Sequence, residues 1–241
     1  MKTVLGLLFL LVGQMLCYAQ APDYDDLKML YADGKYEKLV AKADAYSQKE
    51  ELKKDPFPLM WLCKGLYKIS LSGTDDEKFK NAYKDAIGAM AKVVKIDKDS
   101  ACINTHREFV DEFQNSMVER VNNAIAANKV KDAATWAGKF YKLTTHPIGP
   151  KYIEAAAKFM ANDKGSAATI WKDCEKLMAG IKDLSGWSKA DKDLFRIGIL
   201  LTAECYISNH QKEKAVDLLN KVAQWFEEDE DFKTRYNEIV N

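Results

Sequence analysis

The feature that most constrains the fold is the spacing of apolar side chains, which recur at steps of three and four residues almost everywhere after residue 22. This spacing matches the 3.6-residue turn of an α-helix, and no segment alternates strictly between apolar and polar residues as a half-buried strand would. An apolar stripe on one side of a helix needs a neighbour to cover it. We therefore predict an all-α fold of about ten helices. The stripes lie in residues 24–31, 36–46, 59–69, 79–90, 113–124, 130–141, 153–160, 167–178, 195–206 and 215–226.

Turn-forming residues separate the stripes. Connections of this kind are short, so consecutive helices are expected to run antiparallel as hairpins. Three sequence patterns predict helix starts, because a Ser or Thr followed three residues later by an acidic residue can cap the first turn. These are Thr74 with Glu77, Thr105 with Glu108 and, as a weaker version, Ser188 with Asp191. The predicted turns centre on Gly34, Gly73, Asn128, Asn162 and Asn209.

Three segments share a grammar of a helix, a short polar turn and a second helix that opens with a small or branched apolar residue. The clearest copy covers residues 195–226, and others cover 117–147 and 24–46. In the first of these, Ala203, Tyr206 and Ala215 stand at the packing positions. This grammar resembles the tetratricopeptide repeat, although only the step from Asn128 to Asn162 matches the 34-residue period of that family. The resemblance implies hairpins stacked as a right-handed α-solenoid, with residues 20–241 forming one domain.

The N-terminus is typical of a secretory signal peptide. Lys2 is followed by a largely apolar run over residues 4–16 and then by small residues, and the run is too short to span a bilayer. Cleavage after Ala19 gives a leader of residues 1–19, and a cut after Ala21 remains open. We expect an exported protein without a transmembrane segment, periplasmic if the source is a Gram-negative bacterium and secreted otherwise.

The charge balance limits the classes of partner, and the cysteine content bears on whether a disulfide forms. The 36 basic residues balance the 36 acidic ones, which argues against nucleic acid as a partner. Four cysteines follow the leader, and an oxidising compartment would allow a disulfide or leave them as buried thiols. If one bridge forms, we expect Cys174 with Cys205, because they lie on consecutive helices that should pack together.

Catalytic signatures are missing from the sequence. There are only 3 His residues, and no metal-binding, phosphate-binding or nucleophile-elbow motif occurs. His106 and Glu108 stand two residues apart, so they would point in different directions from a helix and are expected to be exposed residues of a first turn. We therefore expect neither an enzyme nor a cofactor or metal site.

The function that this pattern favours is a scaffold that binds a peptide or protein segment through the first helices of its hairpins. Polar residues off the apolar stripes are the expected contacts, together with two tryptophans that lie off the stripes or beside a turn. The oligomeric state is left open. The alternative is an envelope protein that binds glycan or peptidoglycan through exposed aromatic rings. The predicted contact residues are Lys64, Lys68, Glu112, Arg120, Trp136, Lys158 and Trp187.

Overall fold

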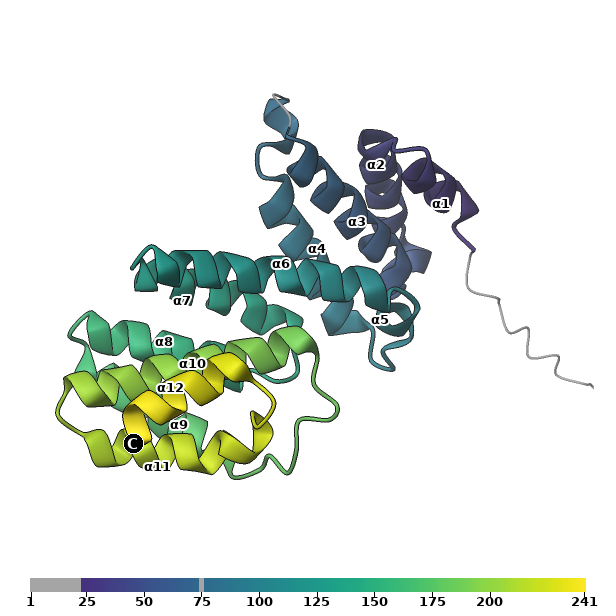
Figure 1. Cartoon of the computed structure of the whole chain (residues 1–241). Coiled ribbons are helices and arrows are strands. Elements are labelled where there is room, and N and C mark those ends of the chain that lie inside the picture. Colours follow the sequence, from purple (N-terminus) through teal and green to yellow (C-terminus); the bar gives the residue numbers. More distant parts are fainter. Residues whose placement is uncertain (1–22, 74–75) are drawn as a thin grey trace, which may run out of the picture.

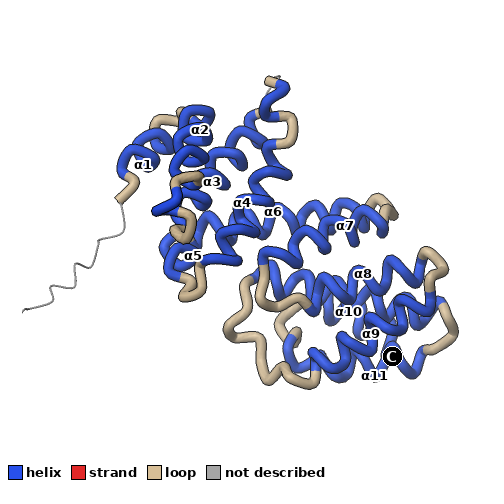
Figure 2. Tube along the Cα trace, turned by 180° about the vertical axis from the view of Figure 1, so that it is seen from behind, coloured by secondary structure: helices blue, strands red, loops and turns tan. Residues whose placement is uncertain are grey.

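The computed structural model describes residues 23–73 and 76–241, and within them the chain forms twelve α-helices, four short 3-10 helices and no strand (Figures 1 and 2). The predicted all-α class is confirmed. The α-helices are α1 (Asp25–Ala32), α2 (Tyr36–Ser47), α3 (Pro56–Ser72), α4 (Ala82–Ile96), α5 (Ala101–Thr105), α6 (Arg107–Ala126), α7 (Val130–Phe140), α8 (Ile148–Met160), α9 (Lys164–Met178), α10 (Lys189–Ser208), α11 (Lys212–Val222) and α12 (Glu230–Val240). The 3-10 helices are η1 (Glu50–Leu52), η2 (Glu77–Phe79), η3 (Tyr141–Leu143) and η4 (Ala223–Trp225).

The predicted leader, residues 1–19 with the alternative cut after Ala21, lies outside the described residues. The body described here begins at Asp23, just before α1. None of its helices combines the length and the apolar content that crossing a bilayer requires.

Ten of the twelve α-helices coincide with the predicted stripes, and α5 and α12 are additional. Helix α5 has only five residues, which is too short to display a period. Helix α12 is mostly polar and buries only Phe232 and Ile239, so its stripe is too sparse to recognise. Asp229 starts α12 by accepting the backbone N–H of Phe232 at 2.9 Å.

The two helices of each of four hairpins are joined by a turn of the same geometry. Gly34, Asn128, Asn162 and His210 adopt left-handed backbone angles, with φ of 69°, 56°, 66° and 57°. After each of them the chain bonds back to the preceding helix in the same way; at the second turn the Asn128 N–H donates to Ile125 and the Lys129 N–H to Ala124, both at 2.8 Å. This pair of hydrogen bonds is the Schellman motif, which satisfies backbone carbonyl groups that a helix end leaves unpaired. Four of the five predicted turn residues, Gly34, Gly73, Asn128 and Asn162, are confirmed, and the fifth is shifted by one residue, from Asn209 to His210.

The same four hairpins bury side chains at the same distances from the turn. The seventh residue before it and the fifth after it have no exposed surface in any of them. The α3–α4 hairpin departs from this rule, because Gly73 is followed by a longer connection that contains η2. The four hairpins therefore share a turn geometry and two buried positions. The buried residues are Leu27, Val121, Ala155 and Ala203 before the turn and Leu39, Ala133, Ala167 and Ala215 after it.

Of the three predicted capping patterns, the one at Thr74 lies outside the described residues, and the other two have different outcomes. Ser188 caps α10 as predicted, since its hydroxyl oxygen accepts the Asp191 N–H at 3.1 Å and its O–H donates to the Asp191 carboxylate at 2.8 Å. The pattern at Thr105 is wrong, because Thr105 ends α5 and its hydroxyl donates to the carbonyl of Ala101 at 2.8 Å.

Helices pack mainly on their neighbours along the chain. Helix α3 packs on α2 and α4, α7 packs on α6 and α8, and α8 packs on α9 and α10. Figure 1 shows α1–α4 at one end of the molecule, α6 and α7 across the middle, and α9, α11 and α12 at the other end. Most buried side chains form one continuous core, with a small separate cluster around Leu27 and Trp61. This order agrees with stacked hairpins, and the right-handed superhelical path stays a prediction.

The predicted bridge between Cys174 and Cys205 is not formed, since both are free buried thiols, as are Cys63 and Cys102. The bridge was expected because the two residues lie on consecutive helices. However, the backbones of α9 and α10 both approach α8 closely, so α8 is their common neighbour. The Cys205 thiol instead lies 3.9 Å from the carbonyl oxygen of Ala156 on α8.

Two glycines allow α8 and α10 to cross at close range. A Cβ atom on Gly198 of α10 would lie 2.6 Å from the Cβ of Tyr152 and 2.8 Å from the carbonyl oxygen of Gly149 on α8. A Cβ atom on Gly149 would lie 2.5 Å from the backbone nitrogen of Phe195. Real Cβ atoms do not approach other atoms this closely, so the crossing requires glycine, which has no Cβ atom, at both positions.

We predict that Gly198→Ala lowers the free energy of unfolding by about 2 kcal/mol, because the added methyl group overfills a packed interface. The matched control is Gly88→Ala, also in a helix interior, where an added Cβ meets no atom within 4 Å. That change should raise stability by up to about 1 kcal/mol, because alanine favours helix more than glycine does. Urea unfolding followed by circular dichroism measures both, and equal effects of the two changes would contradict the close crossing.

Candidate interaction surfaces

Aromatic rings and cationic side chains line the region where α6 crosses α3, α4 and α7. We call this surface the α6 strip. It contains five of the seven predicted contact residues, Lys64, Lys68, Glu112, Arg120 and Trp136, although sequence phase alone did not place them together. The α6 strip consists of Tyr31, Lys64, Tyr67, Lys68, Tyr83, Phe109, Glu112, Arg120, Trp136 and Lys139.

At one end of the α6 strip, the Lys64 ammonium group lies among aromatic rings. Its Nζ is 4.7 Å from the ring centre of Tyr31, 4.5 Å from Trp61 and 5.4 Å from Phe109. Burial and the nearby charge of Lys68 hold the pKa of Lys64 below its ordinary value. The ring faces stabilise a cation that is partly removed from water.

An ion pair joins α3 to α6 in the middle of the strip. Lys68 Nζ lies 2.9 Å from Glu112 Oε1, with the Lys68 side chain 25% and the Glu112 side chain 45% exposed. Beside it, Tyr67 packs edge-on against Phe109 and Phe113, with ring centres 5.9 and 5.2 Å apart. Large rings therefore fill the space between α3 and α6, which leaves their polar residues accessible at the rim.

The other end of the strip carries a group of cations over two rings. The Arg120 guanidinium carbon is 4.0 Å from the ring centre of Tyr83 and 4.8 Å from that of Trp136, and Lys139 Nζ is 3.8 Å from Trp136. Burial lowers the pKa of Lys139, and the like charges of Lys84 and Arg120 lower it further. The sequence analysis missed Tyr83 and Lys139, because Tyr83 was assigned to the core stripe and Lys139 has no distinctive motif.

The remaining two predicted contact residues lie apart from this strip. Lys158 is at the α8–α9 turn, where it pairs with Asp163 at 3.7 Å. Trp187 is half-buried, and its ring stacks on His146 with centres 4.4 Å apart. Trp136 is also half-buried beneath its two cations. Both tryptophans are therefore only partly exposed, whereas exposed contacts were expected.

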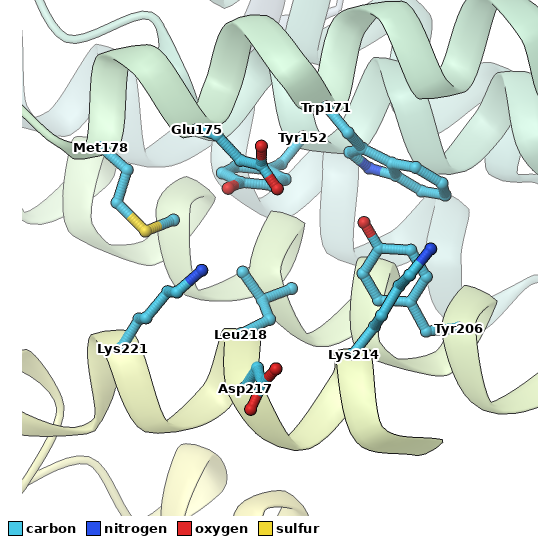
Figure 3. A pocket seen from close by; sticks show the side chains of 9 residues that line it. All are labelled: Tyr152, Trp171, Glu175, Met178, Tyr206, Lys214, Asp217, Leu218 and Lys221. Carbon is cyan, nitrogen blue, oxygen red and sulfur yellow. The ribbon is translucent and has the colours of Figure 1, made fainter. Parts of the chain in front are cut away.

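A second surface is a groove between α9 and α11, floored by α8 and α10 (Figure 3). We call it the α9–α11 groove, and its cavity has a volume of about 180 Å³. Trp171 and Tyr206 form one end, with ring centres 4.9 Å apart. Sequence reasoning missed this site because it depends on how α8, α9, α10 and α11 meet. The groove is lined by Tyr152, Trp171, Glu175, Met178, Tyr206, Lys214, Asp217, Leu218 and Lys221.

His106 lies near the first end of the α6 strip and is half-buried, which corrects the expectation of an exposed turn residue. Its ring centre is 5.2 Å from that of Trp61 and 5.9 Å from that of Phe57. Its Nε2 atom is buried and has no hydrogen-bond partner among the described residues. Burial, together with the positive charges of Lys64 and Lys28, lowers the pKa of His106 to about 4.

We predict that His106 makes stability depend on pH. The unfolded chain binds a proton at His106 near pH 6.5, whereas the folded chain binds it only near pH 4, so folding stability is lost as the pH falls between these values. The loss should reach about 1 kcal/mol, less than the full shift implies, because the ring is only partly shielded from water. Urea unfolding of the wild type and of His106→Leu at pH 7, 5.5 and 4.5 measures it. If the two proteins lose stability in parallel, His106 is not the titrating group.

Comparisons with known proteins add no family to this description. No family model, no curated protein and no solved structure matches the chain. The resemblance to the tetratricopeptide repeat therefore depends on the residues themselves and stays a prediction.

Proposed function

We propose that the protein is an exported, non-catalytic scaffold that binds an acidic protein or peptide segment along the α6 strip. The observation that carries this proposal is charge. Lys64, Lys68, Arg120 and Lys139 line the strip, and Glu112 is the single carboxylate among its defining residues. A segment rich in Asp or Glu would complement this surface and would be steered toward it.

The length and composition of the strip suit an extended segment. From Phe109 to Arg120 the α6 backbone advances about 16 Å. About five residues of extended chain span that distance. Tyr31, Tyr83 and Trp136 offer apolar edges between the cations, and aromatic residues with Arg are enriched where proteins bind one another. The partner would thus contact both rings and charges.

The proposal that the protein is exported depends on the predicted signal peptide of residues 1–19, which lies outside the described residues. The alternative, binding of glycan or peptidoglycan, depended on open faces of Trp136 and Trp187. The first ring is covered by Lys139 and Arg120, and the second is stacked on His146. These contacts favour the polypeptide partner.

We predict that selection of a random peptide library on the mature protein enriches sequences with excess Asp and Glu. The double variant Arg120→Glu with Lys139→Glu should weaken binding of the enriched peptides at least about tenfold, because it places like charges against the ligand. Raising the salt concentration should weaken binding to the wild type, since the charges are partly exposed. Fluorescence anisotropy of a labelled peptide measures each affinity.

The matched control is Lys98→Glu with Lys182→Glu, which makes the same change in net charge at exposed turns away from the strip. Equal loss of binding in both double variants would mean that net charge, not the strip, holds the peptide. Soluble glycan fragments serve as a second probe. A rise of the melting temperature with glycan, and none with the acidic peptides, would replace the proposal with the alternative.

A further inference from the structure

Charged side chains line both walls of the α9–α11 groove: the carboxylate of Glu175 on α9, and the ammonium groups of Lys214 and Lys221 with the carboxylate of Asp217 on α11. Glu175 extends from α9 into the groove, while Lys214 and Lys221 extend toward it from α11, one turn of helix on either side of Leu218 (Figure 3). None of the three forms an ion pair within 4.0 Å with another described residue, although salt bridges are common elsewhere on the described surface.

A buried hydroxyl group also lies at this groove without a partner. Tyr152 is only 1% exposed, and its hydroxyl oxygen has no hydrogen bond within the described part of the chain. The close crossing of α8 and α10 brings the Cβ of Tyr152 against Gly198 of α10. A buried polar group without a partner costs stability, and such groups call for an explanation such as a ligand.

We propose that the α9–α11 groove binds a zwitterionic ligand of the amino-acid class, either a free amino acid or a short peptide. Its ammonium group would lie at Glu175, and its carboxylate would lie toward Lys214 and Lys221. Such a ligand supplies the missing ion pairs on both walls with a single molecule.

The other lining residues fit this chemistry. Leu218 and Met178 give the groove an apolar part, which favours an apolar side chain on the ligand. At one end of the groove the Lys214 Nζ lies 5.9 Å from the ring centre of Tyr206, which packs on Trp171, so these rings stabilise a cation of the protein itself. The Trp171 indole N–H already donates to Thr202 at 3.1 Å, so its ring is held in place before any ligand arrives.

The two tyrosines stay protonated at neutral pH and can act as hydrogen-bond donors. Burial, with a smaller effect of Glu175, raises the pKa of Tyr206 to about 12. Burial also raises the pKa of Tyr152 above its ordinary value of 10. The Tyr152 hydroxyl can therefore donate to a carbonyl or carboxylate oxygen of the ligand.

This site is separate from the α6 strip, which involves none of the same residues. The first experiment is isothermal titration calorimetry of the full mature chain with L-leucine and with the dipeptide leucyl-leucine. Two further probes each lack one charge, leucine amide without the carboxylate and 4-methylpentanoate without the ammonium group. We expect at least one of the two zwitterions to bind at millimolar concentration or below, and each singly charged analogue to bind at least about tenfold more weakly. Tighter binding of the dipeptide than of leucine would identify a short peptide, and not a free amino acid, as the natural ligand.

Three variants test the assigned groups on the zwitterion that binds. Glu175→Gln and the double variant Lys214→Gln with Lys221→Gln should each lower the affinity for this zwitterion at least about tenfold. Tyr152→Phe removes only the unpaired hydroxyl. It should leave the melting temperature of the free protein unchanged or higher, and it should lower the affinity for the ligand. The matched control Glu213→Gln changes an exposed carboxylate at the start of α11 that does not line the groove, and it should bind as the wild type does.

Several results would overturn the inference. They are an absence of heat with both zwitterions, equal binding of an analogue that lacks one charge, or full binding by Glu175→Gln. Unchanged affinity in Tyr152→Phe would show that the hydroxyl is only a packing feature and would remove the observation that singled out this groove. Because the strip variants Arg120→Glu and Lys139→Glu leave the groove intact, they should bind the zwitterion normally whatever the fate of the proposed acidic partner.

Discussion

The close crossing of α8 and α10 at Gly149 and Gly198 is the constraint on which the second half of the molecule depends. Two helices whose backbones approach this closely cannot slide or rotate without a collision between main-chain atoms. The crossing leaves α9 and α11 on the outside, each covering one of the paired helices. The space that remains between these outer helices becomes the α9–α11 groove, with Tyr152 held at its floor.

The first half of the molecule solves the same packing problem with large side chains. Between α3 and α6 stand Tyr67, Phe109 and Phe113, so these two helices meet through rings and not through backbone contact. The wider separation leaves room at the rim for long cationic side chains, which lie over the ring faces. Glycine in one place and phenylalanine in the other thus produce two different surfaces from the same arrangement of hairpins.

Much of this fold could be predicted from sequence, because helical period and turn chemistry are local properties. Asn128 and Asn162 tolerate the left-handed backbone of a helix end, and each stands just beyond an apolar stripe. The shift from Asn209 to His210 shows the limit of this argument, since histidine also adopts that conformation and the preceding stripe does not mark its own last residue. Thr105 was misplaced for a similar reason, because α5 ends where its pattern suggested a beginning.

The surfaces were harder to predict, because they depend on which helices meet. Helical phase correctly separated Lys64 and Arg120 from the core stripes, but it could not show that both would lie along α6. The groove has no local signal at all, since Tyr152, Glu175 and Lys221 come from three helices that only the crossing of α8 and α10 brings together. The expected bridge failed on the same ground, as adjacency along the chain did not imply that Cys174 and Cys205 would meet.

The four unbridged cysteines have a consequence for how this protein would age outside the cell. Burial raises the pKa of Cys102, Cys174 and Cys205 to about 12 and that of Cys63 above its ordinary value as well. Thiolate is the reactive form, so the intact fold resists oxidation. An opened molecule in an oxidising compartment would lose that protection and could be trapped by pairings that the native structure does not contain. The working lifetime of an exported copy would then be set by how often it opens, a rate, and not by its equilibrium stability.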